Sequence, residues 1–380
     1  MPKYPLAPTR DEIMPEFWFR YGATEVSLEV PEEVSYEKIE VKELKPKEDL
    51  WRRVADFADD LERDLGSREV TIIYDYSGDS LSMIVLRHLV NSLEEIHDRV
   101  TIIPSHWRLG ALNEEEYVRK NLKKYGARAK VLPAHECEFT EFKGMKVAKK
   151  LLGSSVNVIV TSSEPHGLLG KASIKEAMVL SGLLRPKLEE SLVKAVQEAW
   201  LQVVGELELY AITNMNDRFF IGEAERVASE IEKTDLTVQI GDFDVVFAGC
   251  GGSPRDSSLQ QVAHVVGLLK DSVNEEGLIG IIAECGRGLG SRSFLDALFG
   301  GGGAPLDREL VKLLRKVSEE RRVTFTSALP KSILKELFGL KCFDVPQEML
   351  TYALRIYSRS ARILILEKPL VKPIRRKAED

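Results

Sequence analysis

The chain has 380 residues, of which 44% are hydrophobic and 30% are charged, a balance typical of a globular protein with one or two domains. Its formal net charge of −7 leaves no surplus of basic groups for non-specific binding of nucleic acid. No apolar run reaches the roughly 18 residues of a membrane-spanning helix, and the amino terminus lacks the apolar segment of a signal peptide. We therefore expect neither nucleic acid nor membrane among the partners.

The four cysteines are Cys137, Cys250, Cys285 and Cys342, and no two of them have CxxC spacing. This scatter argues against a structural zinc site and against a framework of disulfides. We expect buried thiols in a protein of the reducing cytoplasm. The sequence does not indicate an oligomeric state.

Short β-branched runs alternate with amphipathic helical patterns along the chain. The predicted strands are residues 69–75, 99–104, 156–161, 243–249, 277–284, 321–327 and 361–367. The predicted helices are residues 80–96, 113–126, 222–233, 257–269 and 306–320. Continuous apolar strands that alternate with helices predict an α/β protein with mainly parallel sheets, covered by helices on both faces.

A break in this alternation lies near residues 231–244, where one helical pattern ends and a fresh strand–helix series begins. We predict an N-terminal α/β domain over residues 1–235 and a C-terminal α/β domain over residues 236–357. Residues 358–380 are expected to pack back on the first domain. The glycine-rich segment 299–307 predicts a flexible loop inside the second domain.

Residues suited to chemistry follow five of the predicted strands. The segments after these strands read DYSGDS, SHWRLG, SSEPHGLLGK, CGGSPRDSSLQQ and CGRGLGSRSF. Ligands of parallel α/β sheets bind at the carboxyl ends of the strands, so these segments predict a functional cleft. His106 and His166 lie in two of them, and imidazole suits proton transfer near neutral pH. A capping or hydrogen-bonded loop histidine remains the alternative for His106.

Two glycine turns in the second half precede helical patterns. GCGGSPRD leads into a helix that Ser257 and Ser258 can cap, where unpaired N–H groups can hold an anion. ECGRGLGSRSF carries Arg287 and Arg292, whose guanidinium forks suit phosphate or carboxylate. A flexible loop with a salt bridge is the alternative. The residues thus predict an anion-binding cleft with acid–base histidines.

The same segments, in the same order, resemble the lactate racemase family, whose members carry a tethered nickel-pincer nucleotide. YGATEVSLEVPEE resembles the family's opening strand pair, and VTIIPSHWRLGALNEEE resembles its Gly-x-His-Arg-Pro segment. EPHGLLGKASIKEAMVLSG resembles its Pro-His and glycine-rich loop with the cofactor-bearing lysine. GGSPRDSSLQQ and AECGRGLGSRSF resemble two loops of its second domain.

The resemblance implies two α/β domains with an active site in the cleft between them. It implies racemisation or epimerisation of a 2-hydroxy acid by hydride transfer to and from the nickel-pincer nucleotide. His106 and His166 would be the catalytic acid–base pair, and Lys175 or Lys171 would form the link to the cofactor. Other implied site residues are Asp75 and Gly170 at the cofactor, and Gln261, Arg108 and Tyr76 at the substrate.

The sequence departs from the family pattern at three places. Gly78 stands where the family has a substrate-holding arginine, and His264 stands where it has a lysine. The segment after Lys175 contains no counterpart of the nickel-ligating histidine, so the metal ligands are unknown. These departures leave two alternatives to a racemase: another enzyme that uses a nucleotide or a different metal, or a ligand-binding protein without catalysis.

Overall fold

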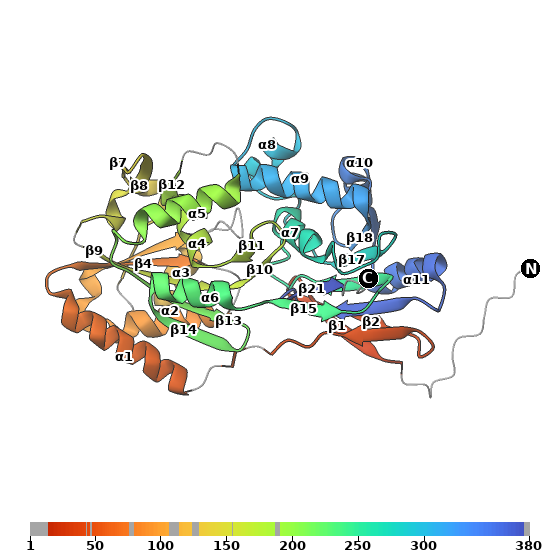
Figure 1. Cartoon of the computed structure of the whole chain (residues 1–380), viewed down its shortest axis with the longest axis horizontal. Helices are drawn as coiled ribbons and strands as arrows, with labels where there is room; N and C mark the ends of the chain where they lie inside the picture. Colours follow the sequence, from red (N-terminus) through yellow and green to blue (C-terminus); the bar gives the residue numbers. More distant parts are fainter. Residues whose placement is uncertain are drawn as a thin grey trace, which may run out of the picture.

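The structure is a computed structural model that describes residues 14–42, 44–45, 48–75, 80–105, 114–123, 129–153, 155–186 and 191–375. Figure 1 shows two sheets with their helices, side by side along the long axis of the molecule. Within the described residues, no helix is long and apolar enough to cross a membrane.

The first sheet has six strands in the order β14-β13-β9-β4-β5-β6, and all but β14 run parallel. Its strands are β4 (Glu69–Asp75), β5 (Val100–Ser105), β6 (Lys130–Val131), β9 (Ser155–Ser162), β13 (Leu209–Met215) and β14 (Arg218–Glu223). The helices of this part are α1 (Glu48–Leu65), α2 (Ser80–Ser92), α3 (Glu114–Lys123), α4 (Ile174–Leu180), α5 (Leu192–Val203) and α6 (Ala224–Lys233).

The second sheet has six parallel strands in the order β19-β18-β17-β16-β20-β3. Its strands are β3 (Ser35–Lys38), β16 (Val245–Gly249), β17 (Leu278–Ile282), β18 (Arg322–Thr326), β19 (Lys341–Phe343) and β20 (Arg362–Leu366). The helices of this part are α7 (Leu259–Leu269), α8 (Arg292–Leu298), α9 (Pro305–Glu320), α10 (Lys331–Phe338) and α11 (Pro346–Tyr357).

The predicted α/β class with mainly parallel sheets is confirmed, and each of the seven predicted strands is present. Burial on both faces explains why these strands are continuously apolar. In β16, Val246 and Ala248 belong to the core under α7 and α9, whereas Val245 and Phe247 face the core on the other side of the sheet. Alternate side chains of one strand therefore supply two separate cores.

The sequence did not predict β3, β6, β13, β14 and β19 of the two large sheets, nor several shorter pairs. β7 (Phe139–Phe142), β8 (Met145–Ala148) and β12 (Leu184–Arg185) form a small antiparallel sheet, and β10 (Glu164–His166) pairs with β11 (Gly170–Ala172) in a hairpin. β15 (Thr237–Ile240) pairs with β21 (Lys372–Arg375). Three 3-10 helices cover Glu94–Arg99, Ala134–Glu136 and Lys149–Leu151.

The chain ends differ from the predicted domain division. The hairpin of β1 (Glu16–Tyr21) and β2 (Thr24–Glu29) places Phe17, Phe19 and Leu28 in the core of the second sheet. β3 follows the hairpin into that sheet, where it pairs with β20. The segment 358–380 thus contributes a strand to the second sheet rather than to the first. A boundary near residues 235–236 stays a prediction.

Candidate functional site

Strand ends from both sheets surround one cleft of about 340 Å³, which we call the arginine cleft. Ser162 and Asn214 line it from the carboxyl ends of β9 and β13 in the first sheet. Arg255 and Lys368 line it from the loops that follow β16 and β20 in the second sheet, and Arg20 reaches it from β1. The cleft therefore lies where parallel α/β sheets bind ligands.

The arginine cleft is predominantly basic. Among its described lining residues, Arg20, Arg255 and Lys368 are basic, and Glu164 is acidic. The Arg255 guanidinium lies 2.8 Å from the Glu164 carboxylate, and their side chains are only 18% and 14% exposed. This pair joins the loop after β16 to the β10–β11 hairpin. Basic side chains outnumber acidic ones among the described lining residues, which favours an anionic ligand.

The β10–β11 hairpin separates the arginine cleft from a second cavity. Pro165 lies opposite Lys171 in the antiparallel register, so both side chains lie on one face of the hairpin. Both residues line the second cavity. Glu164 and His166 lie on the other face because side chains alternate along a strand. Neighbouring side chains of the EPH motif therefore lie on opposite faces of the hairpin.

His166 is 7% exposed and is held by the turn that follows it. Its Nδ1 accepts hydrogen bonds from the N–H groups of Leu168 and Leu169, at 3.2 Å each. In the neutral ring the proton therefore lies on Nε2. The ring stacks on His264 of α7, with centroids 4.4 Å apart and an interplanar angle of 10°. His166 lines neither the arginine cleft nor the second cavity.

Gly167 brings the hairpin into direct contact with α7. A Cβ atom at this position would lie 2.1 Å from the carbonyl oxygen of His264 and 2.4 Å from the amide nitrogen of Leu268. Only glycine permits this approach of two backbones. Gln261, one turn before His264 on α7, is buried, and its Oε1 accepts a hydrogen bond from Ser258 Oγ at 3.2 Å.

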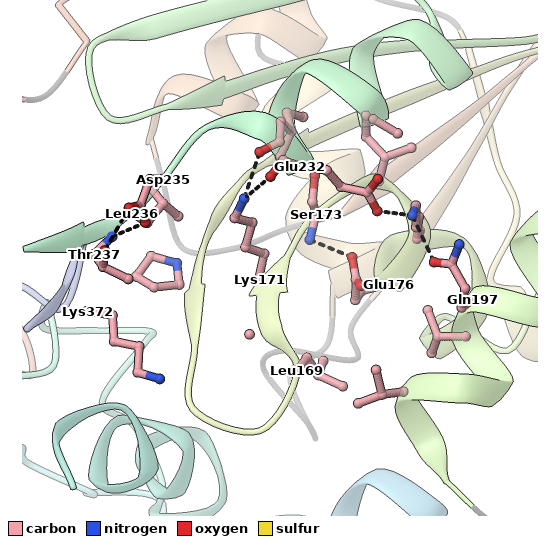
Figure 2. A pocket seen from close by; sticks show the side chains of 18 residues that line it. Leu169, Lys171, Ser173, Glu176, Gln197, Glu232, Asp235, Leu236, Thr237 and Lys372 are labelled. Atoms are coloured by element: carbon pink, nitrogen blue, oxygen red, sulfur yellow. Dashed lines mark hydrogen bonds and ion pairs between the residues drawn. The ribbon is translucent and has the colours of Figure 1, made fainter. Parts of the chain in front are cut away.

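The second cavity, which we call the lysine cavity, has a volume of about 440 Å³. It lies between the hairpin, α4, α5, α6 and the β15–β21 pair, and Figure 2 shows Lys171, Gln197, Glu232 and Lys372 around it. Lys175 lies on its wall with an 8% exposed surface. The Lys175 Nζ donates to Gln197 Oε1 at 2.9 Å and forms an ion pair with Glu232.

Lys171 caps the carboxyl end of α6. Its Nζ donates to the carbonyl oxygens of Ile231, Glu232 and Thr234, at 2.9, 2.8 and 2.6 Å. These oxygens include acceptors that the end of the helix leaves unpaired. Burial lowers the pKa of the Lys171 amine from its ordinary value of 10.5. The Lys171 amine thus uses three hydrogen bonds to hold the end of α6.

The other predicted site residues fall into two groups. Asp75 ends β4 as a fully buried carboxylate, and its Oδ2 accepts from Thr161 Oγ1 at 2.7 Å. Gly170 turns the hairpin at φ +77°. His106, Arg108 and Tyr76, together with Gly78, lie outside the described residues. Among the residues that the structure does describe, no group of three or more His, Cys, Asp or Glu side chains could hold a metal ion.

Asp256 anchors the β1–β2 turn to the second sheet. It is fully buried, and its Oδ2 accepts from the N–H of Gly22 at 2.8 Å and of Glu284 at 3.1 Å. Burial raises the pKa of Asp256 above its ordinary value of 3.8, although the two N–H groups oppose this effect. The turn and the ends of β16 and β17 are therefore joined at one carboxylate.

We expect the thiols of the folded protein to react slowly with a disulfide reagent. All four cysteines are buried and unpaired, and burial raises the pKa of Cys285 from 9.0 to about 12 and that of Cys250 well above 9.0. Since the thiolate is the reactive form, absorbance-monitored titration at pH 8 should show no fast thiol before unfolding and four after it. A thiol that reacts within the mixing time would contradict this expectation.

The sequence did not single out several residues that the structure brings into the candidate sites. They are Arg20 and Lys368 in the arginine cleft, Glu164 in its ion pair, and Gln197 and Glu232 at Lys175. Glu164 directly precedes the Pro-His pair, and this position was a usable signal. Arg20 and Lys368 carry no local signal, because they come from opposite ends of the chain.

The fold and the cleft together define a class: an α/β protein of two mainly parallel sheets whose strand ends face a shared basic cleft. No family model matches the sequence, and no curated protein matches it. The structure is similar to that of the lactate racemase apoprotein from Thermoanaerobacterium thermosaccharolyticum, with a TM-score of 0.69 and 16% identity. The match covers 96% of this chain and 100% of that chain, so the fold is lactate racemase-like.

Proposed function

We propose that this protein binds a small 2-hydroxy acid at the arginine cleft. The observation that carries the proposal is the position of three basic side chains around a 340 Å³ cleft at the strand ends of both sheets. The planar fork of Arg20 or Arg255 can hold the carboxylate through two parallel hydrogen bonds. Ser162 and Asn214 line the same cleft and offer hydrogen bonds to the hydroxyl group.

His166 and His106 are the proposed partners of the ligand's hydroxyl group. His166 does not line the arginine cleft, so its role at the ligand stays a prediction. By the family resemblance, His166 and His106 would alternately take and return the hydroxyl proton. Gln261, Arg108 and Tyr76 remain predicted substrate contacts.

A second candidate function is that of a racemase or epimerase of the bound hydroxy acid. The likeness to a lactate racemase apoprotein along 96% of the chain favours it. When bound, a nickel-pincer nucleotide would supply the hydride acceptor for such a reaction. The described residues do not fit a tethered form of this group. The Lys171 amine donates to three carbonyl oxygens, and the Lys175 amine is paired with Glu232.

The cofactor roles of Lys175, Lys171, Asp75 and Gly170 therefore stay predictions, and intact mass spectrometry tests them. The chain would be produced together with enzymes that synthesise the nickel-pincer nucleotide, and in parallel without them. An equal mass in the two preparations would exclude a tethered group. An added mass that Lys175→Met removes would instead establish the tether, and chiral chromatography of D- and L-hydroxy acids would then follow racemisation.

We expect the variant Arg20→Gln to bind 2-hydroxy acids about tenfold more weakly, because it removes one charge-assisted hydrogen bond. Isothermal titration calorimetry with lactate, propionate and phosphate measures the change and separates the hydroxyl contribution from that of charge. The double variant Arg255→Gln with Glu164→Gln removes a second cation without leaving a lone carboxylate, and should weaken binding further. Arg308→Gln, a change on an exposed arginine of α9, is the matched control.

No binding of any hydroxy acid, or equal affinity of the wild type and Arg20→Gln, would overturn the proposed site.

We also propose a cytoplasmic location, which is supported by the four unpaired, buried thiols.

A further inference from the structure

We propose that the lysine cavity is a second binding site, for a small monocarboxylate with an apolar body. In this site the ligand's carboxylate takes the place of Glu232 on the Lys175 amine. The site is independent of the hydroxy acid site, because the β10–β11 hairpin separates the two cavities.

The cavity has the size of a small-molecule site, and part of its wall is apolar. Its volume of about 440 Å³ lies within the range of ligand pockets, which are mostly lined by apolar side chains. The apolar part of its wall comes from α4, α5, α6 and the segment before β15, and includes Ile174, Val196, Ala228, Ile231 and Leu236. A short hydrocarbon chain would be removed from water here, with a gain of roughly 0.8 kcal/mol for each buried CH₂ group.

The Lys175–Glu232 pair is unequal in its exposure to solvent. The Lys175 side chain is 10% exposed, whereas the Glu232 side chain is 58% exposed. Glu232 lies in the last turn of α6, where the helix dipole disfavours a negative charge. Release of this carboxylate to solvent is therefore cheap, whereas the Lys175 ammonium needs a partner inside the cavity. A ligand anion can supply that partner.

The other charged groups of the cavity are bonded within the protein. Glu176 Oε2 accepts from the Ser173 N–H at 3.0 Å, and Asp235 accepts from the N–H and the hydroxyl of Thr237 at 2.8 Å each. Lys171 is held by the end of α6. Lys372 adds a positive charge on the wall, 3.9 Å from Asp271. Glu232 is thus the carboxylate that a ligand can replace. Because it leaves the Lys175 ammonium when it is replaced, the ligand must be an anion.

The test uses pentanoate as the probe and pentanamide as its uncharged counterpart. Calorimetry of the full chain should show pentanoate binding, with pentanamide at least about tenfold weaker because it lacks the charge. In Glu232→Gln the competing carboxylate is lost, so pentanoate should bind about threefold to fivefold more tightly. Lys175→Met should abolish binding.

Two further variants keep the test decisive if Lys175→Met fails to fold. Ala228→Phe fills the apolar part of the cavity and should block pentanoate. Arg20→Gln alters only the arginine cleft and should leave pentanoate binding unchanged, so failure at one site is distinguishable from failure at the other. The inference is overturned if pentanoate does not bind, if pentanamide binds equally well, or if Glu232→Gln weakens the binding of pentanoate.

Discussion

Replacing Asp256 by alanine is expected to lower the free energy of unfolding by about 2–4 kcal/mol. The substitution leaves the N–H groups of Gly22 and Glu284 without their acceptor inside the protein, and each buried unpaired donor costs about 1–3 kcal/mol. Urea denaturation followed by circular dichroism measures the loss. The β1–β2 turn should also become accessible to limited proteolysis, since Asp256 attaches it to the second sheet.

Asp256→Asn is the matched control, because its amide oxygen can still accept from both N–H groups. We expect a smaller loss of stability than in the alanine variant. Burial raises the pKa of Asp256, so the folded state binds this proton more tightly than the unfolded state. The resulting stabilisation is present below the unfolded pKa of about 3.8 and is lost as the pH rises through the folded pKa.

In Asp256→Asn this part of the pH dependence should disappear, which denaturation curves across the acidic range would show. Equal stability of the wild type and the alanine variant would contradict the anchoring role of Asp256.

Gly167→Ala is expected to cost about 1–3 kcal/mol of stability and to displace the β10–β11 hairpin from α7. The added methyl group would meet the His264 carbonyl oxygen at 2.1 Å and the Leu268 amide nitrogen at 2.4 Å. Both contacts are backbone atoms of a buried helix, which cannot move aside like a flexible side chain. The hairpin also carries Glu164, so binding of hydroxy acids at the arginine cleft should weaken together with stability.

Gly205→Ala provides the comparison, because a Cβ atom there meets no heavy atom within 4 Å. We expect its stability to lie within about 0.5 kcal/mol of the wild type. Urea denaturation gives the stabilities, and the imidazole proton signals in NMR spectra report on the His166–His264 stack. If both alanine variants were as stable as the wild type, the close contact between hairpin and helix would not exist in solution.

The sequence was sufficient to predict the α/β class and seven of the strands, but not β13 of the first sheet, although that strand is mostly buried. The runs that became β4, β9 and β16 are buried on both faces, and burial of that kind requires nearly every residue to be apolar. Such a pattern is local in the sequence, so it can be recognised without knowing which elements pack against the strand. The short hairpins and the small antiparallel sheet were missed because their strands are partly exposed and carry mixed side chains.

The strand-end loops were also predictable, since a break in the apolar pattern and a set of polar residues mark them. Which of their side chains meet was not predictable. The EPHGLLGKASIK segment suggested one site with a histidine and a lysine. The structure divides it, because side chains of a strand alternate between two faces. Glu164 consequently lines the arginine cleft, whereas Lys171 and Lys175 line the lysine cavity.

The sequence by itself therefore determined the α/β class, the seven predicted strands and the helices that became α2, α3, α6, α7 and α9. The tertiary structure decided how charges are paired. Arg255 pairs with Glu164, and Lys175 pairs with Glu232. The tertiary structure also brings Arg20 and Lys368 to one cleft. The physical reason is the distance along the chain over which each effect acts. A buried strand or helix can be recognised from the pattern of apolar residues that are neighbours in the sequence. These ion pairs join residues far apart in the chain, and only the packing of the sheets brings such residues together.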